Sequence, residues 1–289
     1  MEFIKKLFSP ITWTLSLIQN NFKAMLFLLL LFLLFAPESE KDFEQNNLQE
    51  ISLIGPIMEV SEVVSQLDEA ADNDRIKGVL LTIDSPGGAV SPSIEVAYAV
   101  KRLKEKKPVV VYASGTLASG SYYASIWANE IIANPGSMVG SIGVIMQGAD
   151  LSGIMSKLGV KAQTVQAGKY KKIGTPDRPW TPYEINELNK VIQGTYDMFT
   201  EDVAMARGLD IKKRDTFANA HIFTASQAKE VGLIDELGVN YDAKLKVAEL
   251  SGVVNPLWNQ EDKFEKLIKK LSTSTAVALY TYFPKISLQ

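Results

Sequence analysis

Residues 117–145 read LASGSYYASIWANEIIANPGSMVGSIGVI, and they place a serine–glycine pair between an apolar run and a helix-forming segment. Ser119 is therefore predicted to stand at the start of a helix that follows a strand, where backbone N–H groups point outward without helical partners. Such groups can hold a negatively charged oxygen. Most Ser-Gly pairs are only turns, so Ser119 is a candidate nucleophile provided that other parts of the chain supply a base and further donors.

Short apolar runs alternate with amphipathic segments on both sides of this stretch. Strands are predicted at residues 50–58, 78–83, 108–112, 130–133 and 143–146. Helices are predicted at residues 60–71, 92–106, 181–207, 225–231 and 240–250, with a further helix beginning at Ser119. The runs GVLLTI and PVVVY are apolar at successive positions, which is typical of strands buried on both faces. The pattern predicts an α/β domain with a largely parallel sheet and flanking helices.

The composition narrows the classes of function. The chain has 289 residues, of which 46% are hydrophobic, and its net charge is −3. A basic face for nucleic acid is not indicated, so no nucleic-acid partner is expected. The absence of cysteine excludes disulfides and thiolate catalysis, and a single histidine, His221, disfavours a zinc site. No metal or organic cofactor is expected.

The N-terminal region differs in composition from the rest of the chain. Residues 24–36 read AMLFLLLLFLLFA, a run that spans roughly 20 Å as a helix. Phe22 and a snorkelling Lys23 can extend it toward the thickness of a bilayer. Lysines precede the run and acidic residues follow it, so the N-terminus is expected in the cytoplasm and the main domain outside. A cleaved signal peptide is the alternative, but no A-x-A site follows and Pro37 stands directly after the run.

These observations predict the organisation of the chain. Residues 1–21 are interpreted as a cytoplasmic or interfacial segment, 22–36 as a transmembrane anchor and 37–49 as a polar linker. Residues 50–250 form the predicted catalytic domain, and 251–289 a C-terminal helical extension. Apolar residues at helical spacing within residues 262–280 favour packing or oligomer contacts over membrane contact.

A serine nucleophile needs a base, and two kinds of residue could supply it. His221 is the only histidine, so a Ser-His-Asp triad would have to use it, although a structural or surface role is the commoner one. The alternative is a lysine, which accepts a proton only when burial or a cationic neighbour keeps it neutral. Lys169, Lys171 and Lys172 follow the strand-like residues 160–165, but such a cluster is more often a solvated loop.

Further donors are offered by the segment Ser85-Pro86-Gly87-Gly88, which follows a predicted buried strand. Two glycines allow the backbone to approach a ligand closely and to present its N–H groups. Loops at the carboxyl ends of strands are also where α/β proteins bind ligands. Taken alone, this segment could equally be a tight turn.

Four segments together carry a family resemblance. They are IDSPGGAV (83–90), ASGTLASGSYYAS (113–125), NEIIANPGSMVGSIGVI (129–145) and GKYKKIGTPDR (168–178). In this order and at these intervals they resemble the signal peptide peptidase A family, over about residues 50–240. The resemblance implies a membrane-anchored Ser-Lys protease of the short, single-repeat form, with a fold like the Clp protease and crotonase group. It also implies ring-like homo-oligomers in which the serine and the lysine come from neighbouring subunits.

The resemblance also implies roles for individual residues. Ser119 matches the nucleophile, and Lys171 matches the lysine of the family's G-x-x-K motif, the general base. The backbone N–H groups of Gly88 and Gly120 match the oxyanion hole, and Ser141 matches the serine that hydrogen-bonds the lysine. This chain departs from the family's usual ASGGYY at one position, where Ser121 replaces the second glycine and puts the shape of the pocket in question.

The function implied is an endopeptidase that degrades remnant signal peptides and similar extended, apolar peptides. The expected location is the bacterial inner (cytoplasmic) membrane, crossed once, with the catalytic domain on the outer, periplasmic side and the anchor in contact with lipid. Two alternatives stay open. One is a crotonase-like acyl-CoA enzyme that uses only the paired N–H groups. The other is a catalytically inactive, membrane-tethered scaffold.

Overall fold

The computed structural model describes residues 19, 21–27 and 46–259, and it divides the chain into two compact units, Met1–Gln45 and Asn46–Gln289. In the first unit, residues 21–27 are helical and exposed. None of the helices among the described residues is long and apolar enough to span a membrane. Most of the predicted anchor and linker, and the predicted helix within residues 262–280, lie outside the described residues.

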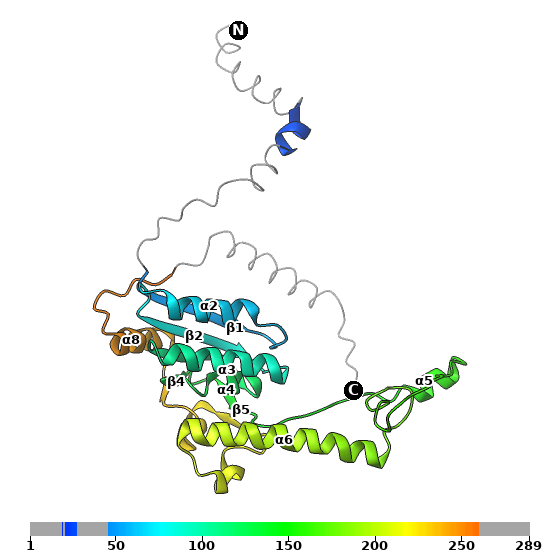
Figure 1. Ribbon diagram of the computed structural model, residues 1–289. Helices are drawn as coiled ribbons and strands as arrows, with labels where there is room; N and C mark the ends of the chain where they lie inside the picture. The colour runs from blue at the N-terminus through cyan, green and yellow to red at the C-terminus, as the bar shows by residue number, and fades with distance from the viewer. Residues whose placement is uncertain (1–18, 20, 28–45, 260–289) are drawn as a thin grey trace. The chain divides into compact units, whose positions relative to one another are not determined.

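A mostly parallel sheet forms the centre of the second unit (Figure 1). Its strands are β1 (Leu48–Ile54), β2 (Gly78–Ser85), β3 (Val109–Ala118), β4 (Glu130–Ala133), β5 (Met138–Gly140), β6 (Ile222–Thr224) and β7 (Glu236–Leu237). Strands β1, β2, β3, β4 and β7 lie side by side in that order and run parallel. The second half of β3 pairs in parallel with β5, which pairs antiparallel with β6. The predicted α/β class with a largely parallel sheet is confirmed.

Helices cover both faces of this sheet. They are α2 (Ser61–Asp72), α3 (Val90–Lys104), α4 (Gly120–Ser125), α5 (Ser152–Lys157), α6 (Pro182–Arg207), α7 (Ala225–Glu230) and α8 (Asn240–Ser251), with a 3-10 turn at Ile211–Thr216. Side chains alternate along β2: Val79 and Leu81 belong to the core shared with α2 and α3, while Leu80 packs with Val247 of α8. Each fully buried side chain of this kind contributes about 1.5–3 kcal/mol, which explains the unbroken apolar runs in the sequence.

Two strand predictions were wrong. Residues 143–146 form no strand, because β5 already ends at Gly140 and Ser141 turns the chain with a φ of 49°. The strand-like residues 160–165 are exposed and form no strand. The folded elements reach beyond the predicted bounds 50–250, since β1 begins at Leu48 and Trp258 forms a parallel bridge with that residue.

Residues 147–180, called the arm below, leave the sheet and extend beyond the amino end of α6 (Figure 1). Most of its side chains, including those of α5, are exposed or only partly buried. The arm is closed on itself where the Leu151 N–H donates to the Pro176 carbonyl at 2.7 Å. Arg178 joins it to α6 through a bidentate ion pair with the buried Glu184, at 2.6 and 2.8 Å. The arm is therefore a projection with little core of its own.

Candidate active site

Ser119 occupies a strained turn between β3 and α4. Its φ of 54° and ψ of −123° lie outside the regions that a residue with a Cβ normally adopts, at a cost of about 1–3 kcal/mol. Two backbone hydrogen bonds hold the turn: Ser119 N–H donates to Gly140 at 2.8 Å, and Tyr123 N–H donates to the Ser119 carbonyl at 3.0 Å. A sharp strand-to-helix turn of this kind exposes a nucleophilic hydroxyl in many hydrolases.

Two backbone N–H groups lie beside this serine. A Cβ placed on Gly120 would come within 3.3 Å of the Gly88 nitrogen, so these two nitrogens are close neighbours. Neither N–H donates to another residue in the part of the chain that the structure describes. Gly120 is the first residue of α4, where the N–H groups lack helical acceptors and carry partial positive charge. The pair can therefore receive an oxyanion.

Gly87 and Gly88 are required by the close approach of three backbone segments. Gly87 has a φ of +91°, and a Cβ on it would lie 2.6 Å from the Gly120 nitrogen. A Cβ on Gly88 would lie 2.1 Å from the carbonyl oxygen of Ile57. The glycine pair thus lets the turn after β2 lie directly against the amino end of α4.

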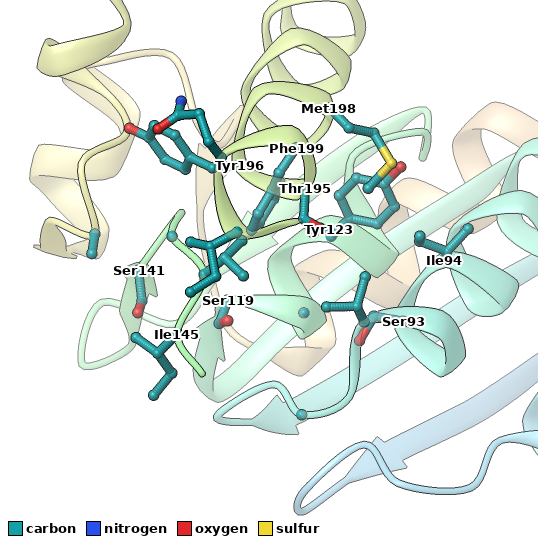
Figure 2. A pocket seen from close by; sticks show the side chains of 18 of the residues that line it. Ser93, Ile94, Ser119, Tyr123, Ser141, Ile145, Thr195, Tyr196, Met198 and Phe199 are labelled. Atoms are coloured by element: carbon teal, nitrogen blue, oxygen red, sulfur yellow. The ribbon is translucent and has the colours of Figure 1, made fainter. Parts of the chain in front are cut away.

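Ser119 opens into a cavity of about 500 Å³ between α3, α4 and α6 (Figure 2). Much of its wall is apolar or aromatic: Val90, Ile94, Tyr123, Val144, Ile145, Ile192, Met198 and Phe199. In Figure 2, Ile94 and Met198 lie to one side of Ser119, and Ser141, Ile145 and Tyr196 lie to the other. The cavity suits an apolar group attached to an extended backbone.

The polar side of the cavity is built on unusual backbone. Ser141, Asn219 and Ala220 have φ values of 49°, 57° and 57°, and with Ser119 they are the non-glycine residues of positive φ within the described residues. Ser141 N–H donates to the His221 carbonyl at 2.7 Å. Asn219 N–H donates to the Tyr196 hydroxyl of α6 at 3.0 Å. Tyr196 therefore fixes the turn at residues 219–221, and this turn fixes the backbone of Ser141.

His221 contributes to the site through its backbone only. Its side chain is exposed and does not line the cavity. No hydrogen bond joins it to Ser119 among the described residues. A triad built on His221 is therefore not present in this chain.

Lys171 lies on the arm and does not line the cavity. Its two neighbours in the lysine cluster are engaged: Lys172 forms a 2.6 Å ion pair with Asp177, and Lys169 lies 4.8 Å from the ring centre of Tyr183. The Lys171 side chain has no hydrogen bond or ion pair to another described residue, and the Ser119 hydroxyl has none either. One chain brings Ser119, Gly88, Gly120 and Ser141 together but does not bring Lys171 to them.

Several cavity residues had no signal in the sequence. Met198, Phe199 and Tyr196 come from α6, and they were predicted only as part of an amphipathic helix. Tyr123 packs edge-on against Phe199 and donates to Asp202 at 2.5 Å. Burial and the neighbouring carboxylate raise the pKa of Tyr123, so it stays a neutral donor. An apolar stripe on α6 could have indicated a buried face, but not which residues reach the cavity.

The residues of this site fall within a segment that matches a known protein family. The model of peptidase family S49 matches residues 101–254, which contain Ser119, Gly120, Ser141 and Lys171. The chain belongs to peptidase family S49. The predicted resemblance to the signal peptide peptidase A group is thereby confirmed at the level of the family.

Curated relatives of this S49 chain are proteases by name. A candidate protease of Methanocaldococcus jannaschii is 45% identical over 193 residues, 67% of this chain and 62% of that protein. A candidate signal peptide peptidase A of Enterococcus faecium is 34% identical, over 62% of this chain and 53% of that protein. A chloroplastic serine protease of Arabidopsis thaliana is 31% identical, over 65% and 28%. The chain thus spans less than two thirds of the length of these relatives.

Proposed function

We propose that this S49 family member is a membrane-anchored serine endopeptidase, with Ser119 as nucleophile and Lys171 as general base. The observation that carries the proposal is the meeting of the strained Ser119 turn with the unpartnered N–H groups of Gly88 and Gly120. A serine hydroxyl beside two such donors is the arrangement that acyl transfer requires. The protease names of the relatives support the same reaction.

The base is proposed to come from a neighbouring copy of the chain. Lys171 stands on an exposed arm whose apolar side chains include Ile154, Leu158 and Val165, at 59%, 74% and 103% exposure. Several strongly exposed apolar side chains on one segment are typical of a surface that another protein covers. A copy whose arm lies against the cavity of the next would bring its Lys171 to Ser119 and Ser141. A head-to-tail contact of this kind is the heterologous type that generates a ring when its rotation closes.

The chemistry then follows from the geometry. The Ser119 oxygen attacks the peptide carbonyl carbon as its proton passes to the amine of Lys171. The carbonyl oxygen becomes an oxyanion and accepts hydrogen bonds from Gly88 and Gly120. Collapse breaks the C–N bond, the leaving amine takes the proton from the lysine, and the acyl-enzyme on Ser119 is hydrolysed by water.

The proposed substrates are remnant signal peptides and similar apolar peptides. The apolar wall formed by Ile94, Met198 and Phe199 fits such side chains. The charge asymmetry around residues 24–36 supports an anchor with the catalytic domain on the periplasmic side of a bacterial inner membrane. A domain tethered there would meet peptides left in the bilayer after cleavage.

The test is labelling of the detergent-solubilised full chain with a fluorophosphonate, which reacts covalently with activated serines. Wild-type protein is expected to be labelled, Ser119→Ala not at all, and Lys171→Ala at least about 100-fold more slowly. His221→Ala is the control and is expected to label like the wild type. Failure of the folded, oligomeric wild type to label would instead favour the scaffold or the crotonase-like alternative.

A further inference from the structure

Ser121 is the position at which this chain departs from the family's usual glycine, and the structure shows where its side chain goes. The side chain is fully buried and is not among the residues that line the cavity. Its oxygen accepts from Ala118 N–H at 2.8 Å. Its hydroxyl lies 2.7 Å from the Ser85 carbonyl and 2.9 Å from the Ala118 carbonyl, and its single proton favours the shorter contact. The Ser121 side chain therefore forms no part of the cavity wall. It lies in the core, in contact with the residue that precedes the nucleophile.

These contacts fill an interruption in the sheet. Ile83 pairs with Ala113, whereas Ser85 pairs with Leu117, so β3 carries two residues more than β2 between these pairs. Regular ladder hydrogen bonds cannot continue through such a bulge. On its outer side, the Asp84 carboxylate accepts from Thr116 N–H at 2.8 Å. On its inner side the ladder resumes at Ser85 and Leu117, and the Ser121 hydroxyl bridges the Ser85 carbonyl and the Ala118 N–H beside that pair.

The two residues that Ser121 joins lead directly to the two oxyanion donors. Ser85 opens the turn that ends in Gly88, and its hydroxyl accepts from Gly87 N–H at 3.2 Å. Ala118 immediately precedes Ser119 and Gly120. A displacement between the ends of β2 and β3 would therefore change the separation of the Gly88 and Gly120 N–H groups.

We propose that Ser121 is a positioning residue whose hydroxyl fixes the spacing of the two oxyanion donors. The proposal rests on the proposed function, because it assigns Ser121 a role in the same reaction. The bound substrate carries no oxyanion, and the charge develops only as the tetrahedral intermediate forms, so a change in donor spacing lowers kcat and leaves KM nearly unchanged. Ser121 itself does not touch the substrate.

The effect of removing the Ser121 hydroxyl depends on whether alanine or glycine replaces the serine. Ser121→Ala removes the hydroxyl that bridges the Ala118 N–H and the Ser85 carbonyl, and it leaves a space too small for water. Ser121→Gly removes the whole side chain and opens room for about one water molecule, which can restore both hydrogen bonds. Packing alone would give the opposite order, because glycine leaves the larger void and is the poorer helix residue. The order of the two variants thus separates positioning from packing.

Ser125→Ala is the matched control. Ser125 lies on the same short helix, is fully buried, and donates to the Tyr122 carbonyl at 2.6 Å. It has no hydrogen bond to the ends of β2 or β3 among the described residues. Its loss is expected to lower thermal stability by an amount similar to that of Ser121→Ala without changing the oxyanion donors.

The experiment measures kcat and KM on a chromogenic peptide, and inhibition by a peptide boronic acid that forms a tetrahedral adduct with serine. All measurements are made well below the lowest melting temperature of the set. Ser121→Ala is expected to lower kcat about tenfold and to weaken boronate inhibition in parallel, with KM within about twofold. Ser121→Gly is expected to lie between Ser121→Ala and the wild type, and Ser125→Ala to match the wild type.

The outcomes separate this proposal from the proposed function. A wild type that neither labels with fluorophosphonate nor turns over overturns both. An active wild type overturns only the role of Ser121 if Ser121→Ala behaves like Ser125→Ala, or if Ser121→Gly has the lower kcat of the two. Because glycine is the family's usual residue at position 121, Ser121→Gly is expected to fold even if Ser121→Ala does not. In that case a Ser121→Gly kcat below that of both wild type and Ser125→Ala supports the proposal, and an equal kcat overturns it.

Discussion

Single residues of this chain are held in conformations that a folded protein usually avoids, and they gather around one cavity. Ser119, Ser141, Asn219 and Ala220 all have positive φ without being glycine. Each such residue costs about 1–3 kcal/mol, and the surrounding hydrogen bonds offset that cost. The strain is thus concentrated where the hydroxyl of Ser119 must project from the end of a strand.

Gly87→Ala tests the contact between the turn after β2 and the amino end of α4. The new Cβ would meet the Gly120 nitrogen at 2.6 Å and the Ala118 carbonyl oxygen at 2.8 Å, so these segments must move apart. We expect kcat/KM to fall about 100-fold or more, as on loss of an oxyanion donor. Gly136→Ala, in an exposed turn with only Asn134 at 3.4 Å, serves as control. Equal activity of the two variants would contradict the geometry described for Gly87.

At the scale of single residues, the sequence predicted the site residues that belong to short motifs but not those that reach the site through helix packing. Gly88, Ser119, Gly120 and Ser141 each sit in a short motif at the end of a strand, and parallel strands bring such ends to one edge. Tyr196 could not be predicted in the same way. Its contact with the Asn219 turn depends on how α6 packs against the rest of the fold, and the local sequence does not indicate that packing.

Among the elements, α6 was predicted closely from its amphipathic pattern, and the structure shows that both of its ends are capped. Thr181 and Glu184 form a capping box, Pro182 follows the cap, and Gly208 ends the helix with a φ of 66°. Strand β3, by contrast, runs to Ala118 rather than to the predicted residue 112. Its second half contains small and polar residues, and pairing with the distant β5 keeps it extended. Long-range pairing of that kind is invisible in a local pattern.

The junction of the arm with α6 makes a prediction about pH. Hydrogen bonds from Arg178 and from the Thr181 backbone lower the pKa of Glu184 from its ordinary value of 4.5 to about 2. A lowered carboxyl pKa stabilises the fold above the ordinary value and loses that effect as the pH falls toward 2. The melting temperature of the wild type should therefore exceed that of Glu184→Gln by a constant amount above about pH 4.5, and the gap should close between there and pH 2.

The control for Glu184→Gln is an acidic residue of the same helix that forms no buried ion pair. Glu187 contacts Lys190 at 2.8 Å on the exposed side of α6. Glu187→Gln is expected to change the stability by less than about 0.5 kcal/mol at neutral pH. A Glu184→Gln gap that persists unchanged at pH 2 would mean that the carboxylate is not what ties the arm to α6.

For the whole molecule, the separation of Ser119 and Lys171 within one chain predicts complementation between inactive variants. Mixing unfolded Ser119→Ala and Lys171→Ala chains and refolding them together places an intact serine beside an intact lysine at about one contact in four. We expect about a quarter of the wild-type rate from the mixture and none from either variant alone. Peptide turnover measured after refolding checks this. An inactive mixture of correctly assembled chains would indicate that both residues must belong to one chain.

Within the second unit, the first and the last described residues lie close together. The N–H groups of Asn47 and Leu48 donate to Leu257 at 3.0 and 3.1 Å, at the edge where β1 begins. The cavity lies at the other edge, where β2 and β3 end. Residues 46–259 therefore form nearly a closed loop of chain, and a short peptide joining residues 46 and 259 would circularise this part without crossing the cavity. A fusion partner joined at residue 46 or 259 would thus be attached at the edge of the sheet opposite the Ser119 cavity.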